Sequence, residues 1–439
     1  MRDKNGMDNR KKDDYSFIKE VIKKKPVDKR AVLIKMGCII GSAVLFGLVA
    51  AFVFASFLPV VEEKNEEPAQ IEFEDDYPED TSNGEPMPET ADTEAAEGSD
   101  NTAAEIQNSA DGEAAAEFGV EEYEKVYEEM NEIAQNAMHS MVTVTGITSS
   151  EDWFNTTTES TKQASGLIVA NNGQELFILT EYRAVDTVDR VMVTFWDNTI
   201  VDCRYQKHDA NTGLTIIKVS LKDMDSSTQQ GVQAATLGNS YLACQGESVI
   251  AIGSPMGYSN SVVNGQITST TNKVTSTDVE YNLLTTNILG SNSGSGVLIT
   301  LDGSVIGIIS QQFGSGDKSV ITCLPISQLK PLIEILSNNG EIPSLGIQGQ
   351  TVTAEIAKQT GMPRGIYVNM VNMDSPALQA GIQNADILIK FNGESVESMA
   401  NYWEKLRKTS VGEEVTVTVM RKGAEGYVEF EFVAVTASQ

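Results

Sequence analysis

Residues 290–310 read GSNSGSGVLITLDGSVIGIIS, two short runs rich in Val, Ile and Leu that a Leu-Asp-Gly turn separates. The same pattern recurs outward from this stretch, where runs such as residues 165–170 (SGLIVA), 214–219 (LTIIKV) and 248–253 (SVIAIG) are broken by Gly, Asn and Asp. Many short strands at nearly regular spacing indicate an antiparallel barrel or sandwich. Residues 141 to about 324 are therefore predicted to form a mainly β domain.

Helical patterns border this domain on both sides. Apolar side chains recur at helical spacing from Glu121, which predicts a helix that leads into the β domain with His139 near its end as a structural residue. Residues 326–340 (ISQLKPLIEILSNNG) predict a second helix that Asn and Gly close. Strands and short helices then alternate from Leu345 to Val435, which indicates a compact mixed domain.

The N-terminal third has a different composition. Residues 36–61 carry no charged side chain over 26 positions, more than the roughly 20 residues that cross a bilayer as a helix. Residues 1–35 hold 12 Lys and Arg against 6 acids, and loops rich in Lys and Arg stay in the cytoplasm. The sequence thus predicts one membrane span with the remaining domains outside. A cleaved signal peptide is the alternative, but the charged leader is long and no A-x-A site closes the apolar run.

An acidic segment separates this predicted span from the globular part. Residues 62–117 hold 20 acids and one Lys and are rich in Ala, Thr, Pro and Ser. Such a composition buries too little apolar surface to offset chain entropy, so a disordered stalk is expected.

Charge and composition exclude several classes of function. The 439 residues contain 32 Lys and Arg against 62 Asp and Glu, a net charge of −30, which argues against binding to nucleic acid. Four Cys without a CxxC pair and only two His provide too few ligands for a typical zinc site. No cofactor motif is present. A catalytic imidazole could come only from His139 or His208. The thiols of Cys203, Cys244 and Cys323 are interpreted as small apolar fillers.

Five segments, taken in order, resemble an HtrA (Do-like) serine protease, a trypsin-type double β-barrel followed by a PDZ domain. They are residues 164–173 (ASGLIVANNG), 246–268 (GESVIAIGSPMGYSNSVVNGQIT), 301–310 (LDGSVIGIIS), 324–336 (LPISQLKPLIEIL) and 374–396 (DSPALQAGIQNADILIKFNGESV). With the N-terminal features, the resemblance implies five parts: a cytoplasmic basic segment (1–35), a transmembrane helix (36–61), an acidic disordered stalk (62–117), the double β-barrel with flanking helices (118–340) and the PDZ domain (341–439).

The resemblance also locates the positions of a catalytic triad, in which a Ser hydroxyl attacks after an imidazole takes its proton and a carboxylate orients that imidazole. The family's TNNHVV becomes TEYRAV (180–185), so Arg183 stands at the base position, and a guanidinium cannot accept a proton. The family's Asp position falls on Gly213. His208 is interpreted as a surface residue.

The nucleophile position has two possible registers. Aligned without a gap on the strand that follows, it falls on Gly294; shifted by one residue, it falls on Ser293. We favour Gly294, because a barrel strand displaced by one residue turns its core face outward.

The PDZ part is better preserved. Ser344, Leu345, Gly346 and Ile347 match the family's carboxylate-binding loop, whose backbone N–H groups receive a peptide C-terminus. Ala385 replaces a Gly before Asp386, where some distortion of a tight turn is expected. A PDZ domain that only packs against the barrel is the alternative.

These features together predict a membrane-anchored, extracytoplasmic and proteolytically inactive HtrA-like protein at a bacterial plasma membrane. It would bind unfolded polypeptides or C-terminal peptides in quality control or regulation of the envelope, and the resemblance implies a homotrimer. An active serine endopeptidase with Ser293 as nucleophile and a purely structural assembly platform are the alternatives.

Overall fold

The computed structural model describes residues 69–76, 119–151, 157–314 and 320–439. The predicted basic segment (1–35) and membrane span (36–61) lie outside these residues. Within the described part, no helix is long and apolar enough to cross a membrane.

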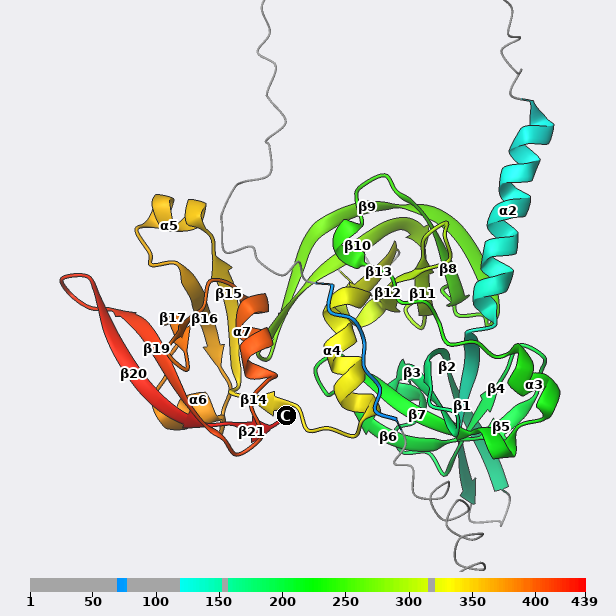
Figure 1. The fold of residues 1–439 in the computed structure, drawn as a ribbon, viewed down its shortest axis with the longest axis horizontal. Helices are drawn as coiled ribbons and strands as arrows, with labels where there is room; N and C mark the ends of the chain where they lie inside the picture. Colours follow the sequence, from blue (N-terminus) through cyan, green and yellow to red (C-terminus); the bar gives the residue numbers. More distant parts are fainter. Residues whose placement is uncertain (1–68, 77–118, 152–156, 315–319) are drawn as a thin grey trace, which may run out of the picture. The chain divides into compact units, whose positions relative to one another are not determined.

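The first half of the β domain is a seven-stranded antiparallel sheet with the order β5-β4-β1-β2-β3-β7-β6 (Figure 1). Its long central pair, β1 and β2, stays in register from Met141 opposite Leu167 to Glu151 opposite Thr157. The strands are β1 (Met141–Glu151), β2 (Thr157–Asn171), β3 (Glu175–Glu181), β4 (Arg190–Thr194), β5 (Ile200–Asp202), β6 (Arg204–His208) and β7 (Leu214–Ser220). Only Cys203 separates β5 from β6, and its N–H donates to the Val191 carbonyl of β4, so one bent strand (200–208) pairs with β4 at one end and with β7 at the other. The two ends of the strand order are thus joined, and this half also closes as a barrel, in agreement with the double β-barrel that the resemblance implied.

The second half is a closed six-stranded barrel with the order β10-β13-β12-β11-β8-β9. Its strands are β8 (Ser248–Ser254), β9 (Ser261–Ser276), β10 (Val279–Leu289), β11 (Ser295–Ile299), β12 (Val305–Ser310) and β13 (Val320–Pro325). The two apolar runs within residues 290–310 form β11 and β12, and every residue of both strands is buried. The prediction of a mainly β domain here is confirmed.

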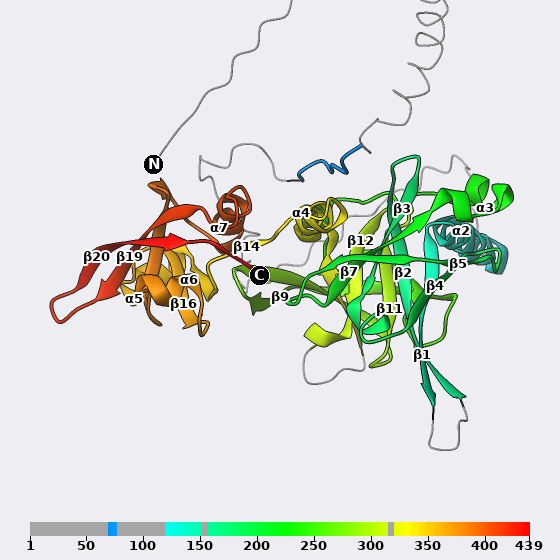
Figure 2. The same ribbon diagram turned by 90° about the horizontal axis from the view of Figure 1, so that it is seen from below.

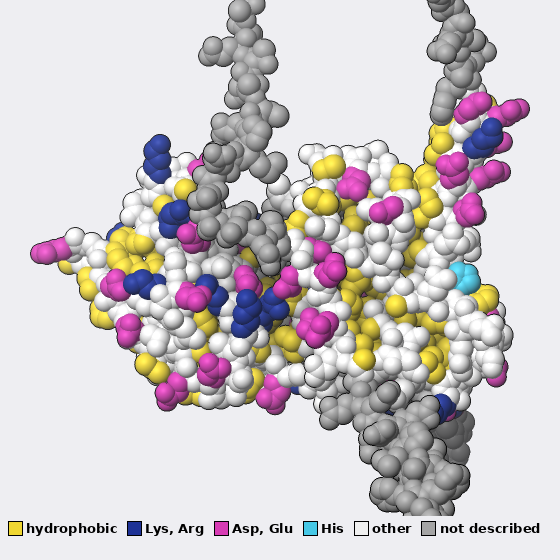
Figure 3. Space-filling view, in the orientation of Figure 1, with side chains coloured by type: hydrophobic (Ala, Val, Ile, Leu, Met, Phe, Trp, Pro, Cys, Tyr) yellow, Lys and Arg dark blue, Asp and Glu magenta, His cyan; other side chains and the backbone are white. Residues whose placement is uncertain are grey.

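Short helices complete the β domain. The predicted entry helix is α2 (Val120–Met138), whose acidic side chains project along its length in Figure 3. The predicted exit helix is α4 (Ile326–Ser337), which buries Leu329, Ile333 and Leu336 in the core. The others are η1 (Tyr182–Ala184), η2 (Leu221–Asp223), α3 (Ser226–Gly231), η3 (Ser240–Leu242) and η4 (Gln311–Phe313).

The C-terminal residues form a second β-rich unit with its own core, which includes Ile347, Phe391 and Tyr402. Its sheet has the order β15-β16-β17-β19-β20, with β18 beside β17, and β14 pairs with β21 (Figure 1). Figure 2 shows β19 and β20 of this sheet as adjacent strands. The strands are β14 (Pro343–Ser344), β15 (Ile347–Val352), β16 (Gly365–Val371), β17 (Ile387–Phe391), β18 (Glu394–Ser395), β19 (Glu414–Lys422), β20 (Tyr427–Val435) and β21 (Ala437–Ser438). The helices are α5 (Ala354–Thr360), α6 (Pro376–Ala380) and α7 (Met399–Leu406).

A short part of the predicted acidic stalk is packed against α4. Ile71 is 7% exposed, and the backbone of this residue exchanges hydrogen bonds with the Asn338 amide (2.9 and 2.7 Å). Asp76 pairs with Lys330 at 2.7 Å, and the side chains of both are nearly buried (12% and 8% exposed). The composition of residues 62–117 did not predict this contact, because one or two apolar residues that fit a specific surface do not change the average composition of 56 positions.

Truncation of Ile71 tests whether residues 69–76 contribute to stability. Ile71→Ala removes buried methyl groups, so we expect the free energy of unfolding in urea to fall by about 2 kcal/mol. The exposed neighbour Glu74 provides the control, since Glu74→Ala should change it by less than about 0.5 kcal/mol. Equal stability of the two variants would mean that the segment is not bound in solution.

Candidate functional site

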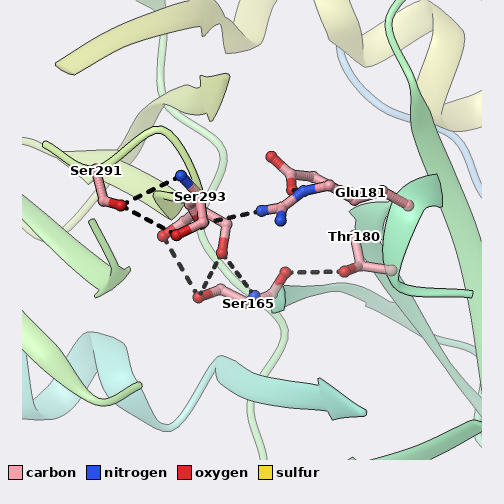
Figure 4. A network of polar contacts seen from close by, with 7 residues as sticks. Ser165, Thr180, Glu181, Ser291 and Ser293 are labelled. Atoms are coloured by element: carbon pink, nitrogen blue, oxygen red, sulfur yellow. Dashed lines mark hydrogen bonds and ion pairs between the residues drawn. The ribbon is translucent and has the colours of Figure 1, made fainter. Parts of the chain in front are cut away.

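Arg183 lies at the loop that connects β10 to β11. It is part of η1, directly after β3, and its side chain is about half exposed (47%). Its Nε pairs with the Glu181 carboxylate, and its Nη2 donates a hydrogen bond to the backbone oxygen of Ser293 at 3.0 Å (Figure 4). The fold thus brings together Arg183 and Ser293, which are 110 positions apart in the sequence.

Ser293 presents the exposed hydroxyl of this loop. Its Oγ lies 3.0 Å from the Ser291 Oγ, and its N–H points to the same Ser291 oxygen at 3.3 Å (Figure 4). Gly294 is buried, and its N–H donates to the Ser291 carbonyl at 2.8 Å. A Cβ at Gly294 would lie 2.4 Å from the Pro255 carbonyl oxygen. The loop therefore has space for a side chain at position 293 and none at position 294.

Gly213 lies beside η1, at the turn between β6 and β7. Its carbonyl accepts a hydrogen bond from the Tyr182 N–H at 2.7 Å, and its φ of +67° favours glycine. The nearby carboxylate of Asp209 is buried and accepts from Thr212 and Asn211 within the same turn. That carboxylate therefore closes a turn rather than pairing with Arg183.

Neither imidazole is hydrogen-bonded to Ser293 in the described part of the chain. The His208 ring stacks on Tyr182 at 3.8 Å between centroids, and its Nδ1 lies 2.6 Å from the Tyr205 hydroxyl. His139 follows α2, where its Nδ1 lies 3.1 Å from the Gly231 carbonyl and its ring lies against Trp196. Both rings therefore have structural contacts of their own.

The thiols also have surroundings that disfavour a nucleophile. Burial raises the pKa of the Cys203 thiol to about 12 and raises that of Cys323 as well. A thiolate is the reactive form, so both thiols are unreactive at neutral pH. Cys244 is exposed.

A buried hydroxyl network behind the loop was not predicted from the sequence. The Ser295 Oγ accepts a hydrogen bond from the Ser165 N–H at 2.9 Å, and the Thr180 hydroxyl donates to the Ser165 carbonyl at 2.9 Å (Figure 4). These residues join β11 of the barrel to β2 and β3 of the sheet. Three hydroxyl side chains within Val- and Ile-rich strands were the available signal, because buried hydroxyls require partners.

Glu181 follows Thr180 in β3 and pairs with Arg183. Burial raises the pKa of the Glu181 carboxyl, and Arg183 opposes that rise in part. The carboxylate is thus held next to a fixed positive charge, and it lies in a side chain only 17% exposed.

The predicted carboxylate-binding loop surrounds a carboxylate that belongs to this same chain. Asp278 occupies the two-residue turn between β9 and β10 and is 1% exposed. It accepts hydrogen bonds from the N–H groups of Leu345 (3.0 Å), Gly346 (2.9 Å) and Ile347 (3.1 Å), and from the hydroxyls of Ser344 (2.6 Å) and Tyr402 (2.8 Å). The four predicted loop residues therefore act together as donors, and Asp278 and Tyr402 are additions that the sequence did not reveal.

The loop depends on a glycine for this geometry. Gly346 has a φ of +81°, and a Cβ there would lie 2.4 Å from the Cβ of Ser375. Only glycine allows the three successive N–H groups to converge without a steric clash.

Comparisons with known proteins agree with this division into two domains. A family model described as a trypsin-like peptidase domain matches residues 164–308, and one described as a PDZ domain matches residues 343–431. The chain has a trypsin-like peptidase domain followed by a PDZ domain.

Curated relatives and solved structures are similar over the same region. The serine protease Do-like HtrB of Bacillus subtilis is 32% identical over 282 residues, which cover 59% of each chain. A probable periplasmic serine endoprotease DegP-like of Halomonas elongata is 29% identical, over 59% of this chain and 54% of the relative. The chain thus matches little more than half the length of these relatives. The solved structure "HtrA-type protease AlgW with decapeptide" has a TM-score of 0.52 at 21% identity, covering 71% of this chain and 98% of the other, which shows a shared fold.

A pair of substitutions tests the two positions of the barrel loop. We expect Gly294→Ala to lower the free energy of unfolding by about 1–3 kcal/mol, because its Cβ would contact the Pro255 carbonyl oxygen. Ser293→Ala, at an exposed side chain, should change it by less than about 0.5 kcal/mol. Urea denaturation of both variants measures the difference, and a tolerated Gly294→Ala would contradict the loop geometry.

The expected distortion at Ala385 is present as a left-handed backbone. Ala385 has a φ of +71°, a conformation that costs an L-residue roughly 1–2 kcal/mol. Ala385→Gly should therefore raise the free energy of unfolding by about 1 kcal/mol, even though glycine adds entropy to the unfolded chain. Gly381→Ala makes the reverse change at a φ of +99° and should lower it. A stability loss in Ala385→Gly would show that the turn is relaxed in solution.

Proposed function

We propose that this chain is an extracytoplasmic HtrA-type protein that binds unfolded polypeptides and exposed C-termini through its PDZ domain without cleaving them. The observation that carries this proposal is the convergence of the N–H groups of Leu345, Gly346 and Ile347 on one carboxylate. A peptide C-terminus also ends in a carboxylate, and backbone N–H groups can bind that carboxylate whatever the side chains of the peptide.

The edge of the PDZ sheet supports peptide binding as well. β15 follows the loop directly and pairs with β16 on one side, while its other edge has no strand partner among the described residues. An extended peptide can add to such an edge by backbone hydrogen bonds. The carboxylate loop would fix the end of that peptide.

The surroundings of Arg183 support inactivity. A hydroxyl becomes a nucleophile when a neighbouring base removes its proton. Arg183, which contacts the Ser293 backbone, can only donate hydrogen bonds and cannot act as that base. The Glu181 carboxylate is paired with Arg183 rather than with a hydroxyl or an imidazole. Among the described residues, no imidazole or carboxylate is hydrogen-bonded to Ser293, which supports a site without a general base.

The proposal includes the location and assembly expected from the sequence. A single span at 36–61 would anchor the chain in a plasma membrane with the N-terminus in the cytoplasm. Relatives named as periplasmic endoproteases support an extracytoplasmic place for the two domains. A homotrimer follows from the resemblance alone.

A second candidate is a serine endopeptidase with Ser293 as nucleophile. The exposed hydroxyl of Ser293 and the space at its position favour this reading, and similar proteins are named serine proteases. It requires an acceptor for the Ser293 proton, which a rearrangement of the loop around Arg183 would have to supply.

Cleavage of casein by the full chain distinguishes the two candidates. We expect no cleavage and no labelling by a fluorophosphonate, because no base contacts Ser293. The matched variant Ser293→Ala should behave in the same way as the unmodified chain. Cleavage that Ser293→Ala abolishes would establish the endopeptidase and reject the inactive protein.

A further inference from the structure

The turn of the β9–β10 hairpin reaches the carboxylate-binding loop of the PDZ domain. Ser276 and Val279 are the last paired residues of this hairpin, so Thr277 and Asp278 form its tip. Asp278 adopts a left-handed φ of +61°, which Asp tolerates better than most residues. The tip therefore carries a carboxylate at the point of closest approach to Ser344–Ile347.

The contact has the hydrogen-bond pattern of a bound peptide end. The Asp278 carboxylate takes the N–H donors of the loop, and its own N–H donates to the Ile347 carbonyl at 2.7 Å. Ile347 is the first residue of β15, the edge strand to which a peptide would add. One residue of the hairpin thus provides both the carboxylate and the first backbone hydrogen bond of strand addition.

The residues after Asp278 extend this contact towards α7. Val279 is buried (7% exposed), and together with Glu280 it lines a cavity whose opposite wall includes Ala400 and Trp403 of α7. Tyr402 of the same helix donates to the second oxygen of Asp278. The hairpin therefore contacts both the start of β15 and helix α7.

Weaker contacts hold the other tip residue. Asn372 donates to the Thr277 hydroxyl at 3.0 Å, and Asn211 donates to the Thr277 carbonyl at 3.3 Å. Neither contact involves a charge. Most of the hydrogen bonding at the tip is therefore made by Asp278.

We propose that Asp278 occupies the PDZ carboxylate site in place of a peptide C-terminus, so that a peptide binds only when the β9–β10 hairpin leaves the loop. This inference rests on the proposed peptide binding and adds its regulation. The two carboxylates exclude each other because they require the same three N–H groups.

A tethered carboxylate is a strong competitor. Intramolecular ligands on short connections reach effective concentrations in the millimolar range. If the loop is free in about a tenth of the molecules, the apparent affinity for a peptide falls about tenfold. Removal of the Asp278 charge should therefore raise the apparent affinity for a peptide by about the same factor.

Two measurements on the full chain test the competition. The first is fluorescence polarisation with a labelled pool of random peptides that end in Val with a free carboxylate, and with the same pool amidated. We expect Asp278→Asn to bind the free-carboxylate pool at least about tenfold more tightly than the unmodified chain, and to show no gain for the amidated pool. Asp302→Asn, at the turn between β11 and β12, is the matched control and should bind as the unmodified chain does.

The second measurement is hydrogen exchange of the amides at residues 345–347. In the unmodified chain these amides should exchange slowly, and Asp278→Asn should speed their exchange. Equal exchange in both proteins, or equal peptide affinity, overturns the occupancy of the loop by Asp278. Faster exchange with no binding of either pool rejects peptide binding instead, and with it the competition, while the Asp278 contact itself stands.

Discussion

A carboxylate removed from water must find hydrogen-bond donors within the protein, and Asp278 finds them in the PDZ loop. Complete burial raises the pKa of the Asp278 carboxyl, while Ser344, Tyr402 and the loop N–H groups act in the opposite direction. The dependence is mutual, because three converging N–H groups would themselves lack partners without an anion. The loop N–H groups would lose little free energy if a peptide carboxylate replaced that of Asp278, whereas a loop with no carboxylate would leave them without partners. This is why the loop can be both fully satisfied within the chain and suited to an external ligand.

The barrel loop is held by a different kind of contact, in which a cation bridges two acceptors. Arg183 is fixed by the Glu181 carboxylate on one side and by the Ser293 carbonyl on the other. Both contacts use the guanidinium as a donor, which is the only role that it has. Behind the loop, the Ser165–Ser295 hydrogen bond secures β11 against β2 without any ionisable group. The loop is therefore held by a guanidinium that only donates and by buried hydroxyls, and the one ionisable acceptor named here, Glu181, is paired with Arg183.

The sequence predicted the elements that are governed by local pattern. The strands of the β domain, the helices α2 and α4, and the donors at Ser344–Ile347 all follow from periodicity or from a contiguous motif. Ala385 is a further example, since the expected strain of a missing glycine is present as a positive φ. The partners of these elements were not predictable in this way. Asp278 is 66 positions or more from the groups that it contacts, and a Thr-Asp pair reads as an ordinary hairpin turn.

The same limit applies to residues 69–76 and to the first sheet. Ile71 contacts Asn338 across 267 positions, so its burial depends on the surface of α4 rather than on its acidic neighbours. Barrel closure is likewise non-local, because β5 and β6 form one bent strand around Cys203 that pairs with β4 at one end and with β7 at the other. Hydrogen-bond closure of a barrel is a property of strand tilt and length, and composition does not encode it.

Helix α7 connects the two unpredicted contacts. Tyr402 donates to Asp278, and Arg407, directly after α7, pairs with Asp75 at 2.9 Å. The two contacts differ in strength, because the Tyr402 bond is buried whereas Asp75 is 56% exposed and its ion pair is screened by water. Of these two contacts, the Tyr402 hydrogen bond therefore holds α7 more strongly. Since burial, and after it the negative charge of Asp278, raises the pKa of the Tyr402 hydroxyl, that hydroxyl remains a donor at any physiological pH. The same carboxylate thus binds both the loop that precedes β15 and helix α7.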